Sequence, residues 1–212
     1  MKEEFEMSMV GQLAYSLGLQ LKQGSEGYFI SQEKYAKNLV KKFDLESCKP
    51  SRTPVSTSTK VSKDETGVSV DNTVYWSLIG SLLYQTASRP DIMFSFIAAQ
   101  RILKYIKGTI QYGLRYSKDS ELSLIGYCDA DWVGNIDDHK STSSGCFFVD
   151  QNLSRTKHID IRHHYTRYLV ESNEIELEYI QTEKQLTDIL TKPLDANQFE
   201  ILRSVLGICR VD

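Results

Sequence analysis

The first half of the chain switches from alternating to helical spacing of its apolar residues. Apolar and polar residues alternate over 17–21, a turn sequence bounded by glycines follows over 24–27, and an extended run resumes over 28–30. This pattern predicts a strand pair that leads into a helix, with Ser31 as the helix N-cap. The apolar face of the helix is expected to consist of Tyr35, Leu39, Val40 and Phe43.

Two further helices are predicted, one on each side of a proline. Over 75–86, apolar residues recur at i, i+3, i+4, i+7 and i+8, which is helical spacing. The next helix is predicted to begin at Pro90, because proline suits the first helical turn, and to end at Gly108. Residues 48–70 precede both helices, and their prolines and polar, aperiodic run predict a linker.

The second half of the chain is predicted to be richer in strands. The pattern indicates strands over 122–129 and 144–149, a helix over 155–170, a strand over 174–180 and a helix over 182–190. The strand over 174–180 alternates most cleanly, since apolar residues occupy one face and glutamates the other. The whole chain is therefore expected to have an α+β fold.

Composition and charge limit the function classes. Hydrophobic residues make up 41% of the 212 residues and charged residues 25%, which is typical of one ordinary globular domain or two small ones. The net charge of −3 is uneven, because residues 1–106 carry +2 and residues 107–212 carry −5. A strongly basic nucleic-acid-binding body is not expected, although local basic faces are compatible with these numbers.

The cysteines and the apolar runs predict an intracellular protein that is not secreted. The four cysteines are widely spaced and form no C-x-x-C pair, so reduced thiols are expected. The first six residues include three glutamates, which does not match a signal peptide. The longest uncharged run, over 72–88, is too polar to span a membrane. The sequence does not choose between cytoplasm and nucleus.

Two acidic residues near the end of a predicted strand form the sharpest local feature. Asp129 and Asp131 are two residues apart and would share one face of that strand. Two carboxylates at this spacing repel each other unless a cation lies near them, and Mg²⁺ prefers oxygen ligands. The other interpretation is a solvated acidic strand end.

Two basic stretches are candidates for contact with phosphate groups. One lies on the helix predicted after residue 31, and the other on the helix predicted over 155–170. The candidate contacts are Lys34, Lys37, Lys41, Arg155, Lys157 and Arg162. The histidines of the second stretch lack the i, i+4 spacing of zinc-binding helices, so a metal site is not expected there. Both stretches could equally be solvated surfaces.

These segments, in this order, resemble the C-terminal part of copia-type retrotransposon Pol polyproteins. The motifs that carry the resemblance are IGSLLY over 79–84, ASRPDI over 87–92, RILKYIKGT over 101–109, GYCDADW over 126–132 and QLTDILTKP over 185–193. The resemblance implies a reverse transcriptase thumb and connection remnant over 1–110 and an RNase H-like mixed sheet with helices over 111–212. It also implies Mg²⁺ as cofactor and an RNA–DNA hybrid and the other Pol domains as partners, with no membrane involved.

The departures from the family pattern affect both activities. The chain contains no Y-x-D-D motif of the RNA-directed DNA polymerase, and the RNase H segments between 149–153 and 154–158 are missing. Among the family's RNase H carboxylates only two have counterparts, Asp129 and Asp188. The set is incomplete, so productive Mg²⁺ binding is not expected. The deletion is also expected to leave a sheet edge unpaired or an apolar face uncovered.

Three functions remain open at this point. The chain could be an inactive Pol remnant, or a weak residual ribonuclease H in which Asp129, Asp131 and Asp188 converge. It could also be a module that binds an RNA–DNA hybrid through its basic faces. An inactive remnant could still bind nucleic acid.

Overall fold

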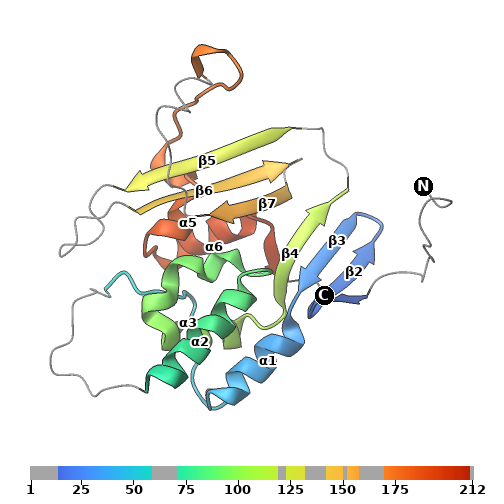
Figure 1. Ribbon diagram of the computed structural model, residues 1–212, viewed down its shortest axis with the longest axis vertical. Helices are drawn as coiled ribbons and strands as arrows, with labels where there is room; N and C mark the ends of the chain where they lie inside the picture. Colours follow the sequence, from blue (N-terminus) through green and yellow to red (C-terminus); the bar gives the residue numbers. More distant parts are fainter. Residues whose placement is uncertain are drawn as a thin grey trace.

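A computed structural model describes residues 14–58, 71–118, 123–131, 142–149, 152–157 and 170–210 of the chain. Within these ranges, residues 94–97, 129–131, 142–144 and 155–157 are described by their backbone alone. Helices lie beneath a three-stranded antiparallel sheet, and a five-stranded antiparallel sheet flanks them at the side (Figure 1). The predicted α+β class is confirmed.

The N-terminal part forms strands and a helix close to where the apolar pattern predicts them. The elements are β1 (Tyr15–Ser16), β2 (Leu19–Gly24), β3 (Gly27–Ser31) and α1 (Glu33–Lys42). The predicted N-cap is wrong, because Ser31 is the last residue of β3 and pairs with Gln20 and Gly113 on the two neighbouring strands. Gln32 occupies the N-cap position without a side-chain capping bond.

The first sheet joins strands from distant parts of the sequence. Its order is β1-β2-β3-β4-β8, all antiparallel, where β4 is Tyr112–Ser117 and β8 is Ile208–Arg210. The sheet therefore crosses the predicted boundary between 1–110 and 111–212. The assignment of those two regions to reverse transcriptase and RNase H remains a prediction.

The helix predicted over 75–86 is confirmed, while the helix predicted from Pro90 to Gly108 is divided. Helix α2 (Asn72–Gln85) begins after Asp71, whose side chain accepts a hydrogen bond from the Thr73 N–H at 2.8 Å. Downstream, a 3₁₀-helix, η1 (Pro90–Ala98), precedes α3 (Ala99–Gly108). Ala98 takes φ −107° and ψ 43° at the junction, outside the helical region, so one continuous α-helix cannot form.

The described part of the predicted linker is attached to α3. The Ser51 N–H donates to the Lys104 carbonyl at 3.1 Å, and the Arg101 guanidinium donates to the carbonyl and hydroxyl oxygens of Thr53 at 3.3 and 3.1 Å. Residues 48–58 form no helix or strand, as the linker prediction expects, and these hydrogen bonds attach residues 51–53 to α3. Residues 59–70 lie outside the described residues.

The second sheet is a three-stranded antiparallel meander. It consists of β5 (Leu124–Asp131), β6 (Thr142–Val149) and β7 (Asn152–Lys157), with a bulge between Phe147 and Phe148. The helix predicted over 155–170 is wrong at its start, because residues 155–157 belong to β7 and pair with β6. Residues 158–169 lie outside the described part of the chain.

The segment over 174–180 forms no strand despite its clean alternation. Its apolar residues Ile175, Leu177 and Tyr179 are 38%, 64% and 87% exposed. No described strand pairs with this segment, so its backbone groups have no ladder to join. The predicted helix over 182–190 is present as two short pieces, η2 (Thr182–Lys184) and α5 (Asp188–Thr191).

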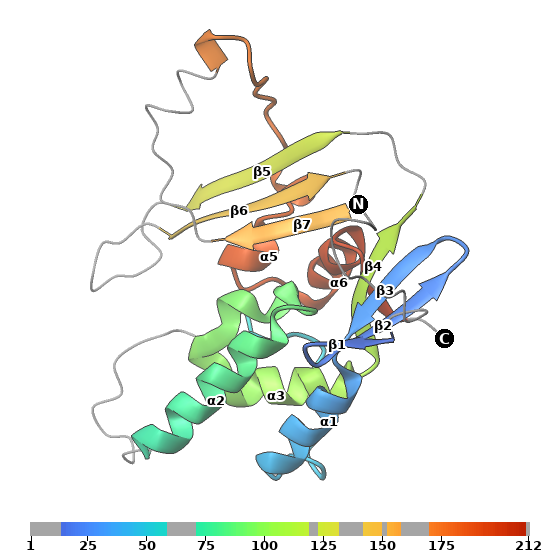
Figure 2. The ribbon, with the colours of Figure 1, turned by 45° about the vertical axis from the view of Figure 1, so that its right-hand side comes forward.

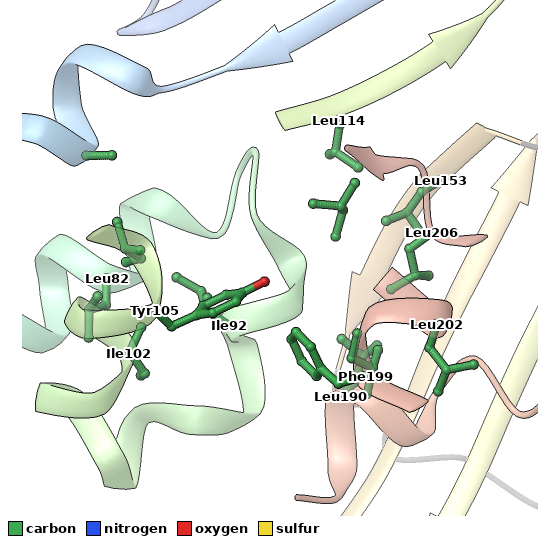
Figure 3. Packing of buried hydrophobic residues seen from close by; sticks show 14 of the residues in the cluster. Leu82, Ile92, Ile102, Tyr105, Leu114, Leu153, Leu190, Phe199, Leu202 and Leu206 are labelled. Atoms are coloured by element: carbon green, nitrogen blue, oxygen red, sulfur yellow. The ribbon is translucent and has the colours of Figure 1, made fainter. Parts of the chain in front are cut away.

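One hydrophobic core joins the two halves of the chain. Figure 3 shows residues of η1 and α3, including Ile92 and Tyr105, on one side of the core, and residues of α5 and α6 (Ala196–Val205), including Leu190 and Phe199, on the other. Tyr105 and Phe199 pack edge to face with ring centroids 5.5 Å apart. In Figure 2 the second sheet covers α5 and α6, and α5 packs between this sheet and η1.

None of the helices in the described ranges is long and apolar enough to cross a membrane.

Candidate functional site

The backbones of the two predicted RNase H residues lie on neighbouring elements. Asp188 is the first residue of α5, which packs against β5 and β6. Just before α5, the Gln185 side-chain amide donates to the Cys128 carbonyl at 3.2 Å, and Cys128 directly precedes Asp129. The fold thus holds the start of α5 close to the part of β5 that carries Asp129.

The carboxyl group of Asp188 is buried against a lysine. Its Oδ1 lies 3.1 Å from the Lys192 Nζ, one helical turn later, and only 4% of the Asp188 side chain is exposed. Asp188 has a further interaction besides this ion pair. A buried carboxylate needs such a compensating charge, and here an ammonium supplies it. A metal ion at this oxygen would have to compete with Lys192.

The side chains of Asp129 and Asp131 lie outside the described residues, so the separation of the predicted carboxylates is not defined. Their backbones belong to β5, where Asp129 pairs with Ser144 and Asp131 with Thr142. Among the described side chains, no group of three or more histidines, cysteines and acidic residues is arranged to hold a metal ion. The convergence of Asp129, Asp131 and Asp188 remains a prediction.

The basic face of α1 is solvent-exposed. Lys34, Lys37 and Lys41 all project from the face opposite the buried Ala36 and Val40. Lys37 forms an ion pair with Glu33 at 2.6 Å, an exposed i, i+4 contact of small energetic value. Within the described structure, Lys34 and Lys41 have no acidic partner. Their ammonium groups are available to solvent or to an anion.

The second predicted basic face is not a helical face at its start. Arg155 and Lys157 belong to β7 by their backbones, where they pair with Phe147 and Gly145. Their side chains, and the whole of Arg162, lie outside the described residues. Their predicted phosphate contacts are therefore untested.

A buried polar network was not predicted from the sequence. The Arg89 guanidinium donates to both carboxylate oxygens of Asp91, at 3.0 and 2.8 Å, and the two side chains are 1% and 0% exposed. The Tyr105 hydroxyl donates to Asp91, and Arg203 from α6 donates to that hydroxyl at 3.1 Å. Arg89 also donates to the Thr109 carbonyl at 2.9 Å. The network ties η1, α3 and α6 together.

The charges of this network shift the pKa values of its members. Burial by itself would lower the pKa of Arg89, but Asp91 and Tyr105 together outweigh it and raise the pKa above the usual value. Burial raises the pKa of Tyr105, and Asp91 raises it further, against the opposing charges of Arg89 and Arg203. Tyr105 is therefore a neutral donor at physiological pH. The sequence signal was the Arg-Pro-Asp triplet at 89–91, but its partners are remote in sequence.

Comparison with known proteins identifies relatives of the chain. Over 164 residues it is 34% identical to the uncharacterized mitochondrial protein AtMg00810 of Arabidopsis thaliana, covering 70% of this chain and 68% of that protein. It is 26% identical to the Retrovirus-related Pol polyprotein from transposon RE1 of the same plant, over 100% of this chain and 20% of the polyprotein. It is 24% identical to the corresponding polyprotein from transposon TNT 1-94 of Nicotiana tabacum, over 98% of this chain and 22% of that protein. The chain belongs to one family with AtMg00810 and is homologous to copia-type Pol polyproteins.

The alignments also show how much of each relative the chain covers. The chain spans about two thirds of AtMg00810 but only about a fifth of the Pol polyproteins. The alignment with the RE1 polyprotein covers 293 positions, whereas the chain has 212 residues, so stretches of that polyprotein have no counterpart here. No family model matches the chain. No solved structure matches it either.

Proposed function

We propose that this copia-type Pol relative is a remnant of the reverse transcriptase and RNase H regions that cleaves no RNA and extends no DNA. The observation that carries the proposal is the state of Asp188, whose carboxyl group is buried and held by Lys192 at 3.1 Å. The alignment with the RE1 polyprotein covers 293 positions against 212 residues of this chain, which supports the absence of part of those regions. Placement of residues 1–110 and 111–212 in those two regions is part of the same proposal.

Two-metal nucleases need several carboxylates converging on a pair of ions about 4 Å apart. Only Asp129 and Asp188 correspond to the family's carboxylates, and Lys192 already neutralises one of them. The described residues at Asp188 therefore do not fit a bound Mg²⁺. Without the full ligand set, metal affinity and the rate of hydrolysis both fall by orders of magnitude.

The test is cleavage of a labelled RNA–DNA hybrid by the purified chain, with Mg²⁺ and separately with Mn²⁺. Circular dichroism on the same sample checks that the chain is folded. We expect product formation equal to that of the Asp188→Asn and Asp129→Asn variants. Cleavage by the natural chain that both variants abolish would refute the proposal and support the residual ribonuclease H instead.

A second function, binding of nucleic acid without cleavage, is favoured by the exposed lysines of α1. Lys34, Lys37 and Lys41 lie on one face over two turns, and Lys34 and Lys41 carry charges that no described acidic residue balances. Such a row can follow a phosphate backbone. Fluorescence anisotropy with a labelled hybrid, measured at several salt concentrations, detects this binding.

The matched variants distinguish this face from general charge effects. Replacing Lys34, Lys37 and Lys41 by alanine is expected to weaken binding. It should also reduce the magnitude of the slope of log K against log [salt] by about 0.9 for each lost phosphate contact. The control replaces three exposed lysines elsewhere, Lys49, Lys118 and Lys184, which changes the net charge equally. Equal losses in both triple variants, or binding that ignores salt, would argue against this interface.

A further inference from the structure

A surface pocket lies at the hairpin of the first sheet. Its volume is about 470 Å³, which is within the range of small-molecule sites. Strands β2, β3 and β4 lie side by side in Figure 1, and the pocket is lined by residues 22–29 of the β2–β3 hairpin together with Arg115 of β4 and Arg210 of β8. Neither Asp188 nor the basic face of α1 contributes to this described lining, so the pocket is a separate site.

Strand pairing places two cations on either side of an aromatic ring. Lys22 pairs with Phe29, and Phe29 pairs with Arg115 on its other side, so the three side chains project from one face of the sheet. Phe29 is 6% exposed, yet it does not belong to the hydrophobic core that joins the two halves of the chain. The tip of its ring lies over Gly113, where an added Cβ would come within 2.8 Å of the Phe29 Cζ. Phe29 therefore gives the pocket an apolar floor.

Positive charge dominates the lining of the pocket. Among the described lining residues, Lys22, Arg115 and Arg210 are cationic and Glu26 is the single acidic residue. Glu26 forms an ion pair with Arg115, and the two side chains are 77% and 53% exposed. An anion that enters the pocket therefore meets three positive charges and one negative charge.

The Glu26 carboxylate occupies a donor that a phosphate group also binds. A guanidinium binds carboxylate and phosphate oxygens through the same N–H groups. An exposed ion pair is weak, so a ligand with two or more negative charges can displace Glu26 from Arg115. Glu26 is one of the two residues between the paired Gly24 and Gly27, so its side chain can turn to solvent without breaking the strand ladder.

We propose that this pocket binds a diphosphate group, either as free pyrophosphate or as the phosphate tail of a nucleotide. Lys22 and Arg115 bind its oxygens from the two sides of Phe29, and Glu26 is displaced. Strands β2 and β4 are two strand spacings apart, about 10 Å, a span that two linked phosphates bridge better than one. The apolar floor strengthens both charged contacts by lowering the local dielectric constant.

The shape of the site favours a compact ligand over a nucleic-acid backbone. The cations of the pocket surround one concave surface, whereas the lysines of α1 form a row along a helix, which suits an extended chain of phosphates. The inference is independent of the proposed function, because neither Asp188 nor the lysines of α1 take part in it. Failure of either leaves the other unchanged.

Isothermal titration calorimetry of the full chain with pyrophosphate, in metal-free buffer of low ionic strength, is the first test. We expect one binding site. Arg115→Gln should weaken binding about tenfold or more, because it removes a charge-assisted hydrogen bond. Glu26→Gln should strengthen binding about two- to fivefold, because it removes the competing carboxylate. Circular dichroism checks that each variant is folded.

The matched controls come from an exposed ion pair outside the pocket. Arg52→Gln and Glu200→Gln break a pair at 3.1 Å and change the net charge by the same amounts as the two pocket variants. Neither control should change the affinity for pyrophosphate. The proposal is overturned by an absence of binding, by equal losses in Arg52→Gln and Arg115→Gln, or by an unchanged affinity in Glu26→Gln.

Competition experiments distinguish the sources of the diphosphate group. A nucleoside diphosphate should displace pyrophosphate, and the unphosphorylated nucleoside should not. Tighter binding of the nucleoside diphosphate assigns the pocket to a nucleotide, and equal binding assigns it to the free anion. Binding of the nucleoside alone, or an RNA–DNA hybrid that depends on Arg115 but does not compete with pyrophosphate, overturns the assignment to a diphosphate group.

Discussion

The buried Arg89–Asp91 pair provides the sharpest stability prediction. Asp91→Asn keeps the size of the side chain but removes the negative charge and turns one oxygen acceptor into a donor that faces Arg89. The pair is bidentate, at 3.0 and 2.8 Å, and both side chains are fully buried. Removing one partner of a buried pair leaves an uncompensated charge and costs about 3–5 kcal/mol. For a chain of this size, the expected fall in melting temperature is about 10 °C.

Two further variants serve as controls, one for the loss of an exposed ion pair and one for the volume of the buried pair. Glu33→Gln breaks the exposed ion pair with Lys37 and is expected to cost at most about 0.5 kcal/mol. The double variant Arg89→Met with Asp91→Leu removes both charges and is expected to be less destabilised than Asp91→Asn alone. Urea unfolding followed by circular dichroism measures all three free energies.

The reasoning about burial would be refuted by either of two results. One is a loss below about 1 kcal/mol for Asp91→Asn, which would place the pair in a solvated environment. The other is a double variant that is less stable than the single one, since the loss would then come from packing and not from an unpaired guanidinium.

Two further predictions concern ionisable groups. Burial raises the pKa of Tyr105 in the folded chain. Its contribution to stability is therefore fully present below the unfolded pKa of about 10 and is lost as pH rises toward the higher folded pKa. The free energy of unfolding should fall at alkaline pH, and Tyr105→Phe should reduce that fall. Burial, and secondarily the neighbouring Cys128, raise the pKa of the Cys146 thiol to about 12, whereas Cys128 is exposed. A thiol reagent at pH 8 should label Cys128 about a hundredfold faster or more, as peptide mass spectrometry would show; comparable rates would mean that the second sheet opens readily.

Local sequence patterns correctly predicted the first hairpin and helix α2. The strands around the turn at 24–27 and helix α2 lie close to the predicted ranges, because alternation and helical spacing each commit one face to the core. The prediction of an unpaired edge came from a missing segment of the family pattern. It stays a prediction, because residues 132–141 and 158–169 lie outside the described part of the chain.

Long-range pairing decided the elements that local patterns predicted wrongly. Residues 155–157 are a strand because β6 lies beside them, and residues 174–180 are not one because no described strand does. The same applies to Ser31, which continues β3 instead of capping α1. A strand is completed by hydrogen bonds to another segment, so its own periodicity does not determine whether it forms.

The sequence by itself determined the family and the α+β class, and its resemblance to the family predicts Asp129 and Asp188 as the remaining carboxylates. The tertiary structure alone decided the surroundings of Asp188. Lys192 is one turn from Asp188, a spacing visible in the sequence, but its role as counter-charge to a buried carboxylate depends on the packing of α5 beneath β5 and β6. Arg203 reaches Tyr105 across 98 residues. Burial converts such contacts from weak surface pairs into strong constraints, and burial is a property of the whole fold.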